Sequence, residues 1–313
     1  MTLIVQCPSG LELLAHPIGG EELITIIDRA KPGADAFDSI TAVLASCFEQ
    51  VIEPGPYRFL EPESTARPSF ARVLQGDILV AILRLRIASF PKLKGLYEFD
   101  FPCSYSECGH LTPWELDLAE LLGNEKLYRS LSPDAFMRVH EGTPFSYKTS
   151  DGQTIYYQLD TPSLAKPLRD LMTRERRKKT TDVEQVARQL VRVDGLRTQK
   201  TNEPVTDLRG LWQWAKRQTA GTLDEVLEAY EASDCGVDTE IRVRCEECGK
   251  EQDINLPFGK TFFRPRASTK KVTTAKDDSG EASSRESMKA SGATSSEQSA
   301  GKPTAAADTA SPS

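Results

Sequence analysis

Two short cysteine turns constrain the fold of this chain more than any other feature. The four cysteines lie in the segments Cys103-Ser-Tyr-Ser-Glu-Cys108-Gly and Cys245-Glu-Glu-Cys248-Gly. Beside both turns, apolar residues alternate with polar ones, as in Tyr97-Glu-Phe99-Asp-Phe101 before the first turn. A period of two is typical of a half-buried β-strand, so each turn is expected at the tip of a β-hairpin. The glycine after each second cysteine lets the turn adopt positive φ.

Two such turns facing each other would bring four sulfur atoms together at tetrahedral spacing. We therefore predict a structural zinc site with the ligands Cys103, Cys108, Cys245 and Cys248. An iron site on the same sulfurs is one alternative, and four free thiols is another, although exposed thiols oxidise readily. His110, two residues after Cys108, could also replace one ligand. Because four sulfurs close the coordination shell, the metal is expected to stabilise the fold without taking part in chemistry.

Cysteine usage and hydropathy favour a reducing compartment. The remaining cysteines, Cys7, Cys47 and Cys235, show no pairing framework and make the total of 7 odd. The segment Met1 to Gly10 carries neither a basic region nor a long apolar stretch, and no run approaches the length of a membrane span. We therefore expect a protein of the cytoplasm of its host or producing cell.

A compositional boundary lies near residue 267. From there to residue 313 the chain consists almost entirely of Ser, Thr, Ala, Gly and Lys with scattered acids, and it has no aromatic residue. A segment of this composition cannot bury enough apolar surface to fold, which predicts a disordered C-terminal tail.

The rest of the sequence predicts an α+β fold in which N-terminal helices pack with the zinc-ribbon-like pair of hairpins. Apolar stripes of helical period indicate helices over 21–31 and 35–52. The rigid turn Glu53-Pro-Gly-Pro-Tyr57 ends the second of these. Residues 77–89 fit either a buried strand or a helix, and their length and leading Asp77 favour the helix.

A long, mostly helical segment separates the two cysteine hairpins. It begins with a hairpin signal around Asp151-Gly152 and continues with helical patterns at 163–178, 182–193, 208–218 and 223–233, the last capped by Thr222. Trp212 and Trp214 cannot share one helix face, so either one ring is exposed at a contact or both are buried. We therefore expect a ribbon split by an insert: an N-terminal part at 1–122, the insert at 123–237, the second hairpin at 238–266 and the tail at 267–313.

Charge is unevenly distributed along the chain. The formal net charge is −7, yet the insert contains a dense basic run formed by Arg174, Arg176, Arg177, Lys178 and Lys179. One interpretation is contact with nucleic-acid phosphates or an acidic protein surface. The other is a solvated helix end, where cations complement the helix dipole. No aromatic residue interleaves with the run, which favours the second interpretation.

The sequence carries no recognisable catalytic signature. Its 3 histidines, His16, His110 and His140, do not form a His-Glu-x-x-His pattern. The nucleophile elbow of hydrolases and the phosphate-binding glycine loop are also missing from the sequence. We therefore expect a protein that is not an enzyme.

A series of short motifs occurs in a distinctive order. They are Pro8-Ser9-Gly10, Glu53-Pro-Gly-Pro-Tyr57, Gly76-Asp77, Leu83-Arg84-Leu85-Arg86, Tyr97-Glu-Phe99 running into the first cysteine pair, and, after the second pair, Leu256-Pro-Phe-Gly259 with Phe262-Phe263. In this order they resemble the baseplate-hub assembly protein family of contractile-tailed phages and related contractile injection systems. The resemblance covers about 8–122 and 238–265, and the insert and the tail lie outside it.

The resemblance implies a non-enzymatic assembly chaperone or hub adaptor that binds hub or other phage-tail proteins, with its retention in the finished particle left open. It identifies no catalytic residue. Phe262-Phe263 is a candidate for an exposed interface, and burial against the N-terminal helices is the alternative. The competing function is a zinc-ribbon nucleic-acid-binding module that uses the basic run.

Overall fold

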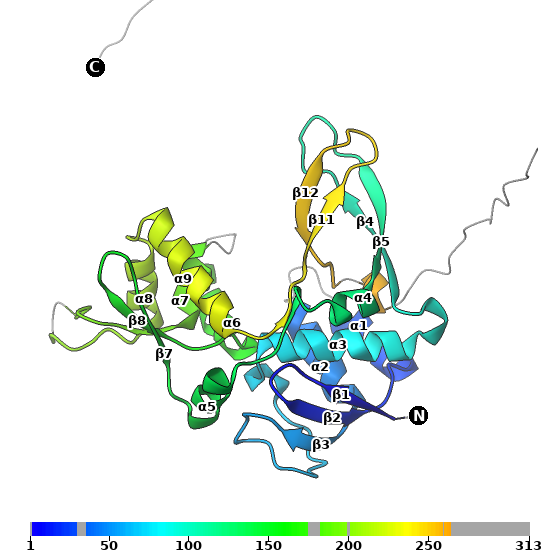
Figure 1. Ribbon diagram of the computed structural model, residues 1–313, viewed down its shortest axis with the longest axis horizontal. Helices are drawn as coiled ribbons and strands as arrows, with labels where there is room; N and C mark the ends of the chain where they lie inside the picture. The colour runs from blue at the N-terminus through cyan, green and yellow to red at the C-terminus, as the bar shows by residue number, and fades with distance from the viewer. Residues whose placement is uncertain (1, 30–35, 175–181, 199–200, 259, 264–313) are drawn as a thin grey trace, which may run out of the picture. The chain divides into compact units, whose positions relative to one another are not determined.

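A computed structural model describes residues 2–29, 36–174, 182–198, 201–258 and 260–263. These residues form a mixed helix-and-strand fold, as the sequence predicts (Figure 1). The basic run lies almost wholly outside them: Arg174 ends a helix, and 175–181 are not described. The predicted tail at 267–313 also lies outside the described residues. The proposed domain boundaries stay a prediction.

The N-terminal part is a three-stranded antiparallel sheet covered by helices. Its strands are β1 (Leu3–Gln6), β2 (Leu11–Ala15) and β3 (Phe48–Pro54), in the order β1-β2-β3. Its helices are α1 (Gly20–Arg29), α2 (Ala36–Cys47) and α3 (Gln75–Ser89). Short 3₁₀ turns at Phe70–Arg72 and Pro91–Leu93 flank α3, and the helix favoured over 77–89 is thereby confirmed.

The predicted helix over 35–52 is wrong in its last turn. The helix ends at Cys47, and β3 begins at the next residue without an intervening loop. Phe48 and Val51 are buried by antiparallel pairing with β2, and this tertiary pairing outweighs the continuing helical period. The strands β1 and β2 were not expected from the sequence.

Both predicted cysteine hairpins are confirmed. The first pairs β4 (Leu96–Pro102) with β5 (Leu111–Asp117), and the second pairs β11 (Glu240–Arg244) with β12 (Glu251–Asn255). The alternation has the expected consequence, since Tyr97, Phe99 and Phe101 are all buried while the residues between them are exposed. The two hairpins lie side by side in Figure 1, although about 120 residues of chain separate them.

The chain between the hairpins combines helices with a second three-stranded sheet. The strands β7 (Phe145–Lys148), β8 (Thr154–Tyr157) and β9 (Leu190–Val193) pair antiparallel in that order. The helices are α4 (Leu118–Gly123), α5 (Pro133–Glu141), α6 (Pro162–Arg174), α7 (Asp182–Gln189), α8 (Leu208–Ala215) and α9 (Ala220–Ser233). The segment leaves and returns at one place, where β6 (Tyr128–Arg129) pairs with β10 (Gly236–Val237).

Two details of this segment correct the sequence predictions, and a third decides between two alternatives. The helix expected over 182–193 ends at Gln189, because Leu190 and Val193 pair with β8 as strand β9. The cap of α9 is Thr219, whose hydroxyl accepts the N–H of Thr222, so Thr222 is not the cap. Trp212 and Trp214 are both buried, and neither indole is exposed at a contact.

A buried carboxylate holds several separate segments together. The hydroxyls of Ser9 and Tyr57 both donate to Oδ2 of Asp77, and the N–H of Ser9 donates to Oδ1 at 3.0 Å. The Tyr57 hydroxyl in turn accepts the N–H of Leu74, just before α3, at 3.1 Å. Burial raises the pKa of Asp77 to about 6, although these hydrogen bonds oppose the shift. The network fixes the Pro8-Ser9-Gly10 turn and the Tyr57 turn on the first turn of α3.

The end of the described chain packs on the same helix. Nε of Arg86 donates to the carbonyl of Phe262 at 2.7 Å, and the Tyr97 hydroxyl donates to the carbonyl of Pro257 at 2.6 Å. Phe262 and Phe263 lie in α10 (Lys260–Phe263) and are 0% and 1% exposed. Of the two alternatives for these residues, burial is therefore the one observed, because both rings fill the core.

Candidate metal centre

The four predicted ligands meet at the tips of the two hairpins. Cys103 follows β4 and Cys245 follows β11, while Cys108 and Cys248 stand at the far ends of the two turns. The four Sγ atoms all lie within 4.8 Å of one another. The structure thus brings together every cysteine that the sequence assigned to the site.

The sulfur spacing fits a tetrahedral metal site. The Sγ atoms of Cys103 and Cys248 are 3.7 Å apart, and so are those of Cys108 and Cys245. A metal with bonds of about 2.3 Å to four sulfurs requires sulfur–sulfur distances of about 3.8 Å. Each of these pairs joins one hairpin to the other, so a bound ion would cross-link both. The four cysteines could therefore hold one metal ion.

The two turns have matching backbone geometry. Gly109 and Gly249 adopt φ of +56° and +68°, the left-handed conformation for which the glycine after each pair was predicted. The N–H of Gly109 donates to the carbonyl of Tyr105, and the N–H of Gly249 donates to that of Cys245. Each first cysteine closes its hairpin through its own N–H, which reaches the carbonyl of His110 or Lys250.

Two residues that sequence reasoning missed support the cluster. The Thr112 hydroxyl, fully buried, donates to Sγ of Cys245 at 3.7 Å across the hairpins. Gln252 links them again, because its Oε1 accepts the N–H of Ser104 at 2.7 Å and its Nε2 donates to the carbonyl of Pro102 at 3.0 Å. The sequence does hint at Thr112, because this polar residue occupies a position of β5 whose alternation places it on the buried face.

Local hydrogen bonds and desolvation give the cysteine thiols of the cluster different pKa values. The N–H of Cys248 lowers the pKa of Cys245 to about 6, and the Thr112 hydroxyl acts in the same direction. The N–H of His110 also lowers the pKa of Cys108, but desolvation and the neighbouring thiols outweigh it and raise the value to about 12. The hydrogen bonds at Cys245 therefore favour the thiolate form that a metal requires.

The other candidate residues lie elsewhere. His110 contributes its carbonyl to the hairpin and is not a member of the sulfur cluster. Cys7 and Cys235 are buried near Asp77, and Cys47 is buried in the N-terminal core. Among the described residues, no other group of three or more His, Cys, Asp or Glu side chains could hold a metal ion.

No helix within the described ranges has both the length and the apolar character needed to cross a bilayer. Comparison with known proteins gives no family model, no curated protein and no solved structure that matches this chain.

Proposed function

We propose that this chain is a non-enzymatic assembly protein of a contractile phage tail or related injection system, acting as a chaperone or adaptor of the baseplate hub. Its cysteine cluster holds zinc in a structural role. The four sulfurs supply a complete tetrahedral shell, which leaves no open position for a substrate or an activated water.

The observation that carries the proposal is the meeting of the motifs that resemble the hub assembly family. Pro8-Ser9-Gly10, the Tyr57 turn and Gly76-Asp77 join in the hydrogen-bond network of Asp77. The second group meets at the other end of α3, where Arg86 binds the carbonyl of Phe262 and Tyr97 binds that of Pro257. These hydrogen bonds join motif residues that lie 160 and 176 positions apart in the sequence, which supports interpreting the motifs as one set.

The environment of the perturbed carboxylates supports a scaffold rather than a catalyst. Burial raises the pKa of Asp77 to about 6 and that of Asp234 to about 7, values that would suit a general acid. Asp77, however, is 1% exposed and its two oxygens already accept hydrogen bonds from Ser9 and Tyr57. Asp234 accepts the N–H of its neighbour Cys235 where α9 ends. Both carboxylates serve the fold.

Co-purification tests the proposal directly. The tagged full chain would be co-expressed with the proteins encoded beside its gene, and the expected result is capture of a hub component in a fixed ratio. A gene neighbourhood without sheath, tube or spike genes would contradict the proposal. The competing nucleic-acid function predicts duplex DNA binding that weakens steeply with salt, with a slope of about −0.9 per phosphate contact.

A further inference from the structure

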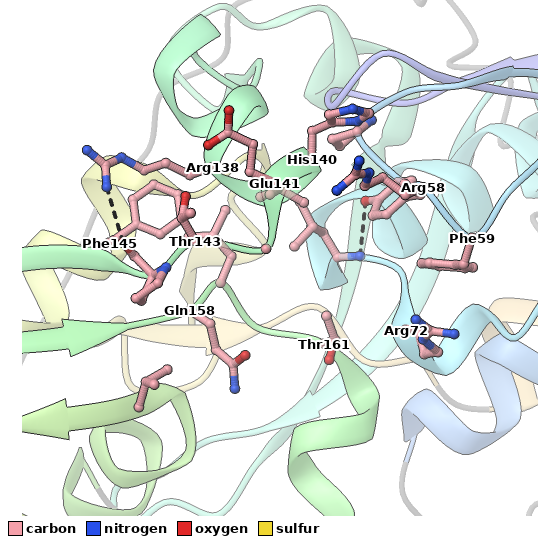
Figure 2. A pocket seen from close by; sticks show the side chains of 18 of the residues that line it. Arg58, Phe59, Arg72, Arg138, His140, Glu141, Thr143, Phe145, Gln158 and Thr161 are labelled. Atoms are coloured by element: carbon pink, nitrogen blue, oxygen red, sulfur yellow. Dashed lines mark hydrogen bonds between the residues drawn. The ribbon is translucent and has the colours of Figure 1, made fainter. Parts of the chain in front are cut away.

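A cleft of about 630 Å³ lies beside the segment that precedes α3, far along the sequence from the cysteine cluster. Its lining residues come from two regions, 56–74 and 138–164, together with Val191 of β9. Figure 2 shows Arg58, Phe59 and Arg72 approaching from the first region and Arg138, Thr143 and Phe145 from the second, with Gln158 and Thr161 below them. The Glu53–Tyr57 motif contributes Pro56 and Tyr57 to the lining, but its sequence gives no sign of a cleft.

The floor of the cleft is apolar. Leu74, Phe145 and Leu159 are buried side chains that line it, and Leu164 and Val191 extend the same surface with partly buried side chains. Phe145 and Val191 belong to the two edge strands of the β7-β8-β9 sheet. Such a floor can accept a bulky apolar side chain.

The rim of the cleft is cationic. Arg58 and Arg72 are exposed, and neither has an ion-pair partner among the described residues. The guanidinium of Arg72 stacks over Phe59 with 4.2 Å between its Cζ and the ring centroid, which holds the charge at the rim. Arg138 stands opposite, paired with Asp134 outside the cleft at 2.9 Å. Positive charge thus gathers here in a chain of net charge −7.

The wall at 140–141 carries one imidazole and one carboxylate. Nδ1 of His140 is buried and has no hydrogen-bond partner in the described part of the chain. Glu141 is the one carboxylate among the described lining residues, and it is exposed. The uncompensated charge of the cleft is therefore positive, which favours an anionic occupant.

The exposed rim shows which kind of ligand fits the cleft better, a small molecule or a polypeptide. Small-molecule pockets usually bury about 70–90% of their ligand. Here Arg58, Arg72, Thr143 and Gln158 are all exposed around the cleft, so a small ligand would remain largely in water. A peptide segment can place one side chain on the floor and extend its acidic residues along the arginine rim.

We infer that this cleft binds an acidic peptide segment of a partner protein, with one bulky apolar side chain on the Leu74–Leu159 floor and carboxylates at Arg58 and Arg72. The inference rests on the cleft alone and does not depend on phage-tail assembly. It also assigns no role to the cysteine cluster.

Peptide selection on the full chain tests this inference. The probe is a displayed library of eight-residue peptides in which each member carries two or more acidic residues and one Phe, Leu or Trp. The wild-type chain is expected to enrich such peptides, and R58E/R72E is expected to weaken the binding of enriched peptides at least about tenfold. The variant T143W, which fills the cleft without changing charge, should weaken the same peptides.

A matched control separates the cleft from general charge effects. R67E/R217E changes two exposed arginines outside the cleft and alters the net charge equally, so it should leave peptide affinity within about twofold. Failure to enrich any peptide, or equal weakening by both double variants, would overturn the inference. Binding of inorganic phosphate that R58E/R72E abolishes, without peptide enrichment, would overturn it in favour of a small anion.

Discussion

At the scale of single residues, Asp77 is the most constrained side chain of the N-terminal part. It is buried, it accepts hydrogen bonds from Ser9 and Tyr57, and the thiols of Cys7 and Cys235 lie against it. Hydrogen bonds from two hydroxyls and one amide favour the carboxylate, whereas desolvation favours the neutral acid and prevails. The stability of the fold should therefore depend on the protonation state of Asp77.

The sign of that linkage gives a prediction. A carboxyl whose pKa is about 6 in the folded chain and about 3.9 unfolded binds its proton more tightly when folded. Its stabilising contribution is complete below pH 4 and is lost as the pH rises through 6. Wild type should therefore gain about 1 kcal/mol over Asp77→Asn in unfolding free energy when the pH falls from 7 to 5. Urea denaturation at both values measures this.

The exposed carboxylate Glu61 offers a control for the same experiment. Glu61→Gln should leave the difference between pH 5 and pH 7 as it is in wild type. If Asp77→Asn and wild type show the same pH dependence, the carboxyl of Asp77 is not held in the desolvated environment that the structure gives it.

At the scale of elements, the sequence predicts structure well where the pattern is local. The cysteine hairpins combine a period of two with turn residues, and both are found where the sequence predicts them. The ends of α2 and α7 were misplaced because Phe48, Val51, Leu190 and Val193 also continue a helical stripe. Only pairing with strands distant in sequence makes them β3 and β9.

The same reasoning explains what could be predicted of the sites. Residue type and spacing single out the four cysteines, so all four members of the sulfur cluster were predicted. Thr112 and Gln252 support them through contacts across more than 130 residues, for which no local pattern exists. The arginine-rimmed cleft escaped prediction because its walls come from segments that carry no common motif.

The cysteine cluster gives the prediction for the hairpins. With the proposed zinc site, Cys108→Ser should abolish metal binding and expose the backbone amides of 96–117 and 240–255 to hydrogen exchange, because each hairpin has only two strands. The N-terminal core around α3, which buries apolar side chains, should keep its protection. Metal analysis and hydrogen-exchange mass spectrometry on the full chain measure both effects.

His110→Ala is the matched control for this experiment. The side chain lies beside the cluster in sequence but outside it in space, so metal content and protection should stay at wild-type levels. Loss of the metal in His110→Ala, or its retention in Cys108→Ser, would contradict a site formed by the four sulfurs.

At the scale of the whole molecule, one backbone contact joins the N-terminal part to the segment that follows the insert. The N-terminal turn of α3 meets the segment that returns from the insert, where Gly76 lies against Cys235 and Gly236. A Cβ at Gly76 would stand 1.9 Å from the carbonyl oxygen of Cys235. Gly236 adopts φ of +127°, and its own Cβ would lie 2.6 Å from Cα of Gly76. Only glycine fits at either position.

Gly76→Ala should therefore destabilise the whole fold, and we expect a loss of at least about 3 kcal/mol in the free energy of unfolding. The clash is with backbone, so no side chain can move to relieve it. Gly221→Ala is the matched control, because the Cβ added in α9 meets nothing closer than 4.0 Å and alanine favours a helix. Denaturant unfolding of both variants measures the difference. Equal stability of the two would mean that the returning chain does not close on α3.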